Sequence, residues 1–402
     1  MIKTLIYKLL SFVKKAISLV LFRLFWLFKK KNKIVATTMR GRKYGDNPKF
    51  IVEKLRELRP DLDFVWFCNE PCTYDLPKGV KACNYYSPIR KIYEYATAKV
   101  WINSHRIESY IRKNNGQLFV ETWHGGLGIK RIESDQVRVL SDYSINEINN
   151  TSRLADVFIS NSDHLTNIYR HAFKYKGPVL KCGYPKNDIF FGNNDEIRKK
   201  VREYFHVGDE GKLLMYAPTF RDSFERTGTI DFSLFDIDFA RLKVSLTVRF
   251  GGEWKIIVKW HPVMASYIRD NKINALEGVI DATEYPDMQE LILSTDILIS
   301  DYSSCLFDAA LREIPCFIFA TDFEEYKKER GVYYELEELP FLYAKDNEEL
   351  MKNIKEYDHN VYIQKWESFK GKTGLVETGH ASEIIANKIM DFIDGKSVEW
   401  DK

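Results

Sequence analysis

The stretch Ile297-Leu298-Ile299-Ser300-Asp301-Tyr302-Ser303-Ser304 places an apolar run directly before a polar turn. The run predicts a buried strand, and the turn opens a helix. Hydroxyls and backbone N–H groups at a helix start can hold phosphate oxygens. Ser303 and Ser304, with Asp301 just before them, are therefore candidate phosphate ligands, although serines at this position would also serve as plain helix caps.

The same order of strand and helix repeats on both sides of this stretch. Apolar runs at residues 213–216, 256–258 and 316–319 belong to its series. An earlier series, with runs at residues 33–38, 64–68 and 118–122, lies before residue 190. Two such series predict an α/β chain with two doubly wound, Rossmann-like domains facing a central cleft, the architecture called GT-B. We expect these domains at residues 33–200 and 201–402.

Composition narrows the class of protein. A length of 402 residues fits two domains, and 45% hydrophobic with 29% charged residues is typical of a globular protein. The net charge of +3 argues against a nucleic-acid partner. The six cysteines lack paired CxxC spacing, which argues against a metal centre or a disulfide framework and favours a reducing compartment.

Charge is concentrated at the N-terminus, where residues 1–45 hold twelve Lys or Arg and no acidic residue. At helical spacing, residues 1–32 form an amphipathic helix with lysines on one broad face and apolar side chains opposite. The lysines are Lys3, Lys8, Lys14, Lys15 and Lys29, and the apolar residues are Ile6, Leu9, Val13, Ile17, Leu24 and Leu27. This pattern is typical of a helix lying on an anionic membrane surface, with Trp26 as an apolar anchor. The alternatives are a cleaved signal peptide, which the interrupting charges oppose, and a helix packed on the protein itself.

Two histidines occupy short turns after predicted strands. His124 lies in Trp123-His124-Gly125-Gly126, where glycines let a ligand approach the backbone closely. His261 lies before Pro262, which fixes the chain after it. Imidazole titrates near neutral pH and can accept a proton from a hydroxyl, so His124 is a candidate base and His261 a candidate stabiliser of phosphate charge. We expect the two imidazoles to converge across the cleft between the domains. For each, the alternative is a purely structural histidine.

Further polar groups follow other strands. Arg221 could pair with phosphate in bidentate fashion, and Lys186 offers a point charge. Each signal is weak alone, because such clusters are ordinary turn chemistry. The other candidate substrate-binding residues in these turns and beside His124 are Thr219, Asn187, Asp188 and Lys130. The histidines without a comparable setting, which we interpret as structural or surface groups, are His105, His164, His171, His206, His359 and His380.

These motifs, taken together and in order, resemble the CDP-glycerol glycerophosphotransferases of teichoic acid and related cell-envelope polymer synthesis. The matching motifs are Tyr44-Gly45-Asp46-Asn47-Pro48-Lys49, Ala98-Lys99-Val100-Trp101-Ile102-Asn103-Ser104, Glu121-Thr122-Trp123-His124-Gly125, Gly183-Tyr184-Pro185-Lys186-Asn187-Asp188, Tyr216-Ala217-Pro218-Thr219-Phe220-Arg221-Asp222, Trp260-His261-Pro262, and Ser300-Asp301-Tyr302-Ser303-Ser304 with Phe307-Asp308.

The resemblance implies that the protein transfers an alditol phosphate from a CDP-alditol to an acceptor hydroxyl and releases CMP. Glycerol phosphate is the foremost candidate for the transferred group, and the acceptor is a lipid-linked glycan or a polyol phosphate. The resemblance also implies peripheral attachment at the cytoplasmic face of the cell membrane. The family's essential histidines fall on His124 and His261, and its donor-binding residues on Arg221, Asp301, Ser303 and Ser304.

Two departures from the family pattern bear on the substrates. The family usually reads Trp-His-Gly-Thr-Pro-Leu-Lys, whereas here Gly126-Leu127-Gly128-Ile129 precedes Lys130, which places the lysine one residue further from the histidine. Lys186 replaces the common arginine and loses its planar fork. The identity of the polyol and of the acceptor, teichoic acid or capsule, therefore stays open.

No carboxylate cluster in the sequence demands a metal, so no metal ligand is assigned; Mg²⁺ assistance at the donor pyrophosphate is the one cofactor considered. The main alternative function is a GT-B glycosyltransferase that uses a nucleotide sugar for capsule or envelope polysaccharide. A non-catalytic membrane-bound scaffold is the outside alternative.

Overall fold

The computed structural model describes residues 2–30, 32–69, 74–222, 224, 227–270 and 278–401, with side chains of residues 2–12, 262 and 263 left undescribed. The chain divides into two compact units. Unit 1 comprises Met1–His124, Leu140–Asp188 and Val376–Lys402, and unit 2 comprises Gly125–Val139 and Ile189–Leu375. Each unit is built around one parallel sheet, which confirms the predicted pair of Rossmann-like α/β domains.

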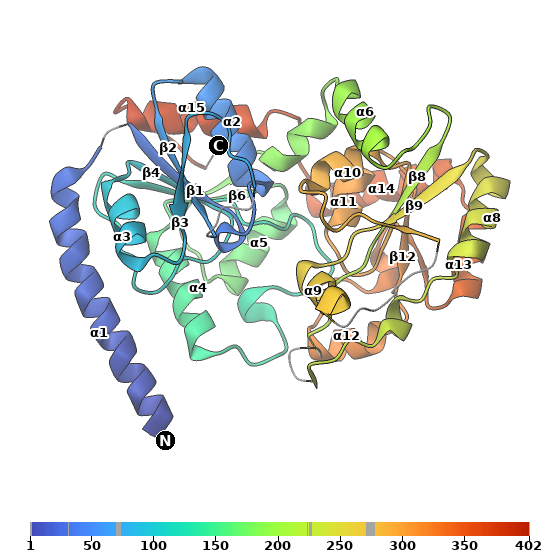
Figure 1. The fold of residues 1–402 in the computed structure, drawn as a ribbon, viewed down its shortest axis with the longest axis horizontal. Helices are drawn as coiled ribbons and strands as arrows, with labels where there is room; N and C mark the ends of the chain where they lie inside the picture. The colour runs from blue at the N-terminus through green and yellow to red at the C-terminus, as the bar shows by residue number, and fades with distance from the viewer. Residues whose placement is uncertain are drawn as a thin grey trace. The chain divides into compact units, whose positions relative to one another are not determined.

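The sheet of unit 1 has the order β3-β2-β1-β4-β5-β6-β7, and every pairing in it is parallel (Figure 1). The central strands are apolar on both faces because helices cover both sides of a parallel sheet. Their order places the ends of β1, β4 and β5 next to each other. The strands are β1 (Lys33–Thr37), β2 (Asp63–Cys68), β3 (Val80–Asn84), β4 (Val100–Asn103), β5 (Leu118–Glu121), β6 (Val157–Ser160) and β7 (Val179–Lys181).

The α-helices of unit 1 lie between or beside these strands, although β2 leads to β3, and β4 to β5, without an α-helix between them. Their buried faces pack on a core that includes Val35, Phe67 and Trp101. The helices are α1 (Ile2–Phe25), α2 (Asp46–Leu58), α3 (Pro88–Thr97), α4 (Asp142–Leu154), α5 (Asp163–Ala172) and α15 (Ala381–Ile393).

Unit 2 contains a second parallel sheet with the order β10-β9-β8-β11-β12-β13. The apolar run Ile297–Ser300 forms the strand β11 in the middle of this sheet, as predicted. The side chains of Ile297, Leu298 and Ile299 are all buried there. The strands are β8 (Lys212–Ala217), β9 (Trp254–Val258), β10 (Ile280–Asp281), β11 (Ile297–Ser300), β12 (Cys316–Phe319) and β13 (Leu342–Ala344). The helices are α6 (Asp195–Tyr204), α8 (Phe239–Phe250), α9 (Pro262–Asp270), α10 (Met288–Ser294), α11 (Cys305–Ala310), α12 (Phe323–Glu329), α13 (Asn347–Lys355) and α14 (His359–Thr373).

The units differ from the predicted ranges 33–200 and 201–402 in three places, the smallest of which is that residues 189–200 belong to unit 2. The C-terminal helix α15 belongs to unit 1, where it packs beside α2 (Figure 1). Its apolar face, with Ile385, Ala386 and Ile389 fully buried, explains why the chain returns there. Conversely, residues 125–139 pack in unit 2, where Leu127 and Ile129 join the core.

The N-terminal helix was predicted to be amphipathic. Its described part buries Ser18 and Phe22 against unit 1, and Ser18 Oγ donates a hydrogen bond to the Tyr110 carbonyl oxygen at 2.6 Å. The predicted positions Lys3, Ile6, Lys8 and Leu9 lie among the undescribed side chains. The predicted apolar positions Val13, Ile17, Leu24 and Leu27 are exposed, as is Val20. Among the helices of the described residues, none has the length and apolar character needed to cross a membrane.

Candidate functional site

His124 lies three residues beyond β5, at the carboxyl edge of the unit 1 sheet. Its Nδ1 lies 2.9 Å from the carbonyl oxygen of Ser104, which follows the neighbouring strand β4. A carbonyl only accepts hydrogen bonds, so Nδ1 carries the proton of the neutral ring. This tautomer makes Nε2 the basic nitrogen, which is the arrangement that a general base needs.

The turn that carries His124 is held in a strained conformation. Trp123 has a φ of 52°, a left-handed value that bulky residues rarely adopt. Its N–H donates to Glu121 Oε1 at 2.9 Å, and its ring packs on Phe173 with centroids 4.9 Å apart. Such strain persists only where the surroundings enforce it, and it is common at functional sites.

Asn47, at the start of α2, joins two of the predicted motifs. It is fully buried, and its Nδ2 donates to the Trp123 carbonyl oxygen at 3.1 Å. Its Oδ1 accepts from the Lys186 backbone N–H at 3.2 Å. The Asn47 amide therefore connects the His124 turn to the Lys186 turn, a role that local sequence patterns did not reveal.

His105 was interpreted from the sequence as structural or surface, but it lies beside His124. The two ring centroids are 5.7 Å apart, and the His105 ring stacks on Trp123 at 6.4 Å and 6°. Removal from solvent, and then the proximity of His124, lower the pKa of His105 well below its ordinary value. The ring is therefore neutral at physiological pH.

In the Gly183–Asp188 turn, the side chains of Asn187 and Asp188 contact the segment at residues 377–382. Asn187 is fully buried, and its Nδ2 donates to Glu377 Oε1 at 3.0 Å. Asp188 accepts from the backbone N–H groups of Ala381 and Ser382 at 3.0 and 2.7 Å, at the start of α15. These contacts explain both side chains as supports of the turn, so their direct contact with substrate stays a prediction. Lys186 lies buried in the same turn.

Arg221 in unit 2 lies in a setting other than the one predicted. Its Nε and Nη2 donate to the Asp322 carboxylate at 2.6 and 2.9 Å, and its Nη1 donates to Asp301 Oδ2 at 2.8 Å. The guanidinium fork thus contacts two carboxylates, and Asp322, which the sequence analysis did not single out, is its main partner. These contacts make Arg221 a positioning residue for Asp301, and its direct contact with phosphate stays a prediction.

Asp301 organises the turn after β11. Its carboxylate accepts the Thr219 N–H at 2.9 and 3.1 Å and its neighbour Tyr302 N–H at 2.6 Å. The Thr219 hydroxyl oxygen is buried and has no hydrogen-bond partner among the described residues. Ser303 Oγ accepts the Cys305 N–H at 3.3 Å, and Ser304 is the N-cap residue of α11. The predicted group Thr219, Asp301, Ser303 and Ser304 therefore comes together at one edge of the sheet.

Lys130 belongs to the same part of unit 2. Its segment runs antiparallel to Val332, with Tyr333 N–H donating to the Ile129 carbonyl oxygen at 2.7 Å. A Cβ on Gly128 would contact Ser304 at 4.0 Å, so this segment lies against the serine turn. Burial, and then the Arg330 charge, lower the pKa of Lys130 to about 8.

His261 lies three residues beyond β9 in unit 2, with its ring stacked on Phe220 at 5.3 Å. Its carbonyl oxygen accepts the Ala265 N–H at 3.0 Å in the first turn of α9. His261 and His124 belong to different units, so their predicted meeting stays a prediction. Within the described part of the chain, no group of three or more His, Cys, Asp or Glu is arranged to hold a metal ion.

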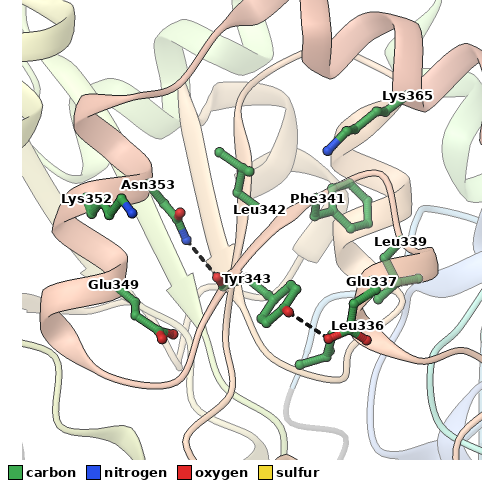
Figure 2. Close-up of a pocket in the computed structure, with 10 residues that line it drawn as sticks. All are labelled: Leu336, Glu337, Leu339, Phe341, Leu342, Tyr343, Glu349, Lys352, Asn353 and Lys365. Carbon is green, nitrogen blue, oxygen red and sulfur yellow. Dashed lines mark hydrogen bonds between the residues drawn. The ribbon is translucent and has the colours of Figure 1, made fainter.

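A separate hollow borders the edge strand β13 (Figure 2). Tyr343 OH donates to Glu337 Oε1 at 2.6 Å, and Asn353 Nδ2 donates to the Tyr343 carbonyl oxygen at 2.7 Å. Its acidic residues Glu337 and Glu349 balance Lys352 and Lys365. None of the predicted site residues lines it, so it does not form part of the candidate site.

Comparison with known proteins places these features in one family. Residues 19–391 match the family model described as CDP-Glycerol:Poly(glycerophosphate) glycerophosphotransferase. The chain is 30% identical over 377 residues to the teichoic acid poly(glycerol phosphate) polymerase of Bacillus subtilis strain 168, covering 90% of this chain and 49% of that protein. It therefore spans about half the length of that relative.

A second relative has a similar length. The poly(glycerol phosphate) polymerase of Bacillus spizizenii strain W23 is 30% identical over 386 residues, covering 92% of this chain and 95% of that protein. Among solved structures, the wall teichoic acid polymerase TagF superposes with a TM-score of 0.80 at 26% identity, covering 97% of this chain and 96% of that one.

Proposed function

Because the chain belongs to the CDP-glycerol:poly(glycerophosphate) glycerophosphotransferase family, we propose that it transfers an alditol phosphate from a CDP-alditol to an acceptor hydroxyl and releases CMP. Glycerol phosphate is the first candidate, because the relatives at 30% identity are poly(glycerol phosphate) polymerases. The acceptor is a lipid-linked or polymeric cell-envelope chain, with teichoic acid favoured over capsule by the same relatives.

The observation that carries this proposal is the contact between His124 Nδ1 and the Ser104 carbonyl oxygen. It leaves Nε2 to accept the proton of the acceptor hydroxyl as that oxygen attacks the phosphorus bearing the alditol. The new O–P bond forms as the bond from this phosphorus to the bridging oxygen breaks, and CMP departs with that oxygen. In such transfers the main catalytic tasks are to position the attacking group and to stabilise the charge that develops in the transition state.

Unit 2 supplies the donor side of the proposed reaction. Ser303, Ser304 and the Thr219 hydroxyl are the hydrogen-bonding groups for the pyrophosphate, and His261 and Lys130 supply charge or donors for the departing CMP. Arg221 acts through Asp301, which fixes the Thr219 and Tyr302 backbones. Mg²⁺ bound to the donor's own phosphates is a further proposal, tested by adding and chelating the ion.

We also propose that α1 lies on the cytoplasmic face of the cell membrane. Ile17, Val20 and Leu24 are 56%, 65% and 50% exposed and recur at helical spacing, which supports an apolar stripe turned away from unit 1. Exposed Arg23, Lys29 and Lys30 lie on or just beyond the helix and suit anionic headgroups.

A donor panel tests the proposed activity. The full chain is incubated with a lipid-linked glycerol phosphate acceptor and with CDP-glycerol, CDP-ribitol or a UDP-sugar, and nucleotide release is measured. We expect acceptor-dependent CMP release, fastest from CDP-glycerol. Consumption of the UDP-sugar without CMP release from either CDP-alditol would instead establish the glycosyltransferase alternative.

A further inference from the structure

A cluster of basic residues beside His124 has no part in the proposed transfer step. Arg40 follows β1, and His105 and Arg106 follow β4. These strands are neighbours, with Thr37 paired to Asn103, and β4 in turn pairs with β5. The three residues therefore share the edge of the sheet at which His124 lies.

Acidic groups balance this cluster only in part. Arg40 Nη2 lies 2.6 Å from Glu147 Oε2, and Arg106 Nε lies 3.8 Å from the same oxygen. Glu147 is fully buried, so one carboxylate faces two guanidinium groups. The neighbouring pair Lys91 and Glu108 is balanced within itself.

Two further charged residues lie near the cluster in the described part of the chain. Arg42 is close enough to act on His105, and Glu121 binds the Trp123 backbone. Arg40, Arg42 and Arg106, taken together with Lys91, therefore outnumber the carboxylates Glu147, Glu108 and Glu121. The cluster retains a positive charge that favours an anionic ligand.

His105 adds an unsatisfied polar group to this charge. Its Nδ1 atom is shielded from solvent and has no hydrogen-bond partner among the described residues. A buried polar atom without a hydrogen-bond partner lowers the stability of the fold. Because His105 Nδ1 is such an atom and lies beside His124, we infer that a bound ligand supplies its hydrogen bond. The backbone of the preceding loop is also strained, since Met39 and Arg40 have φ values of 45° and 57°.

Building on the proposed function, we propose that Arg40, His105 and Arg106 bind a phosphodiester of the acceptor chain, the one nearest the attacking hydroxyl. In a terminal glycerol phosphate unit, the hydroxyl oxygen and the phosphorus are separated by three carbons and one ester oxygen, about 6 Å when extended. The His105 and His124 rings are 5.7 Å apart, so a hydroxyl at His124 brings this phosphate to the cluster.

This spacing also selects among acceptors. In a ribitol phosphate unit the same two groups are about 9 Å apart when extended, so only a folded conformer would bring its phosphate to the cluster. An acceptor that ends in a sugar hydroxyl offers no phosphodiester at this distance. The site therefore favours extension of an existing glycerol phosphate chain over starting one on a sugar.

The experiment compares two soluble lipid-like acceptors, one ending in a sugar hydroxyl and one already carrying a glycerol phosphate unit. With CDP-glycerol as donor, we expect His105→Ala and Arg106→Gln to raise KM for the glycerol phosphate acceptor about ten- to hundredfold, the loss typical of one charge-assisted contact. KM for CDP-glycerol should stay within twofold, and the wild-type preference between the acceptors should disappear. His171→Ala, on an exposed histidine of unit 1, and Arg112→Gln, on an arginine that donates to backbone carbonyls, are the matched controls.

A binding measurement separates failure of this inference from failure of the proposed function. Calorimetric titration with a short poly(glycerol phosphate) oligomer needs no turnover, and both variants should weaken it by the same factor while the controls do not. Unchanged oligomer affinity, or an equal effect on both acceptors, would overturn the phosphodiester site. If wild type releases no CMP with either acceptor, the proposed function fails, and oligomer binding still decides whether the cluster holds phosphodiesters.

Discussion

The side-chain amide of Asn47 joins the backbones of two turns that are more than sixty residues apart in sequence, at Trp123 and Lys186. Asn47→Ala leaves the Trp123 carbonyl and Lys186 N–H without this partner. We expect a loss of about 1–3 kcal/mol in the free energy of unfolding. The rate kcat should fall as well, because the His124 turn is strained and loses its clamp. Chemical denaturation and CMP release measure the two effects.

Asn115→Ala is the control for this substitution, since Asn115 is an exposed loop residue of the same unit. Both quantities should stay at wild-type values in the control. An Asn47→Ala protein with unchanged kcat would show that the clamp does not position His124.

Gly183 precedes the Lys186 turn in a conformation that only glycine adopts readily. Its φ is +93°, and an added Cβ would lie 2.8 Å from Glu377 Oε2. Gly116 has a similar φ of +81°, with nothing within 4 Å of its added Cβ. Gly183→Ala should therefore cost about 1–3 kcal/mol more unfolding free energy than Gly116→Ala. Urea unfolding of both proteins checks this, and equal losses would mean that Glu377 moves aside without cost.

The fold was largely predictable because the central strands are short apolar runs between turns. Apolar runs at residues 33–38, 64–68 and 118–122 became β1, β2 and β5. The edge strand β3 was missed, since Lys81 and Ala82 are exposed and the strand has no apolar run. The return of α15 to unit 1 was missed because packing between distant segments leaves no local pattern.

The site was predictable where glycine, proline or serine marks a turn, and less so elsewhere. His105 follows β4 just as His124 follows β5, and this equivalence was the available signal. The contacts of Arg221 with Asp301 and Asp322 were not predictable, because they join segments that lie far apart in the sequence.

The lowered pKa of Lys130 predicts that kcat/KM for CDP-glycerol depends on pH. Burial and the Arg330 charge lower the pKa of Lys130 to about 8, so it loses its charge at a lower pH than an ordinary lysine. Below this pH the charged ammonium should assist CDP-glycerol binding, and above it this contribution is lost. In wild type, kcat/KM for CDP-glycerol should decline above about pH 8, since this parameter reports groups of the free enzyme.

Lys130→Arg provides the check, because arginine keeps its charge over this range. The decline in kcat/KM should then move beyond the alkaline end of the profile. Superimposable profiles for the two proteins would assign the alkaline limb to another group.

The exposed apolar stripe on α1 predicts that the protein binds membranes and that a single charged residue in the stripe weakens this binding. Ile17→Glu and Val20→Glu should each remove about 1.5–3 kcal/mol of apolar burial at the membrane surface. Both should therefore reduce sedimentation with vesicles of mixed phosphatidylglycerol and phosphatidylcholine. Val248→Glu, on the 79% exposed Val248 of unit 2, is the matched control and should sediment like wild type. Equal sedimentation of all four proteins would reject α1 as the membrane-binding element.

The role of His124 as the base is tested most directly by the rate of CMP release from CDP-glycerol by His124→Ala, with donor affinity measured in parallel by calorimetry. Loss of a positioned base should lower kcat about 10²- to 10⁴-fold while the Kd for CDP-glycerol stays within twofold of wild type. Near-normal turnover by His124→Ala would contradict the account.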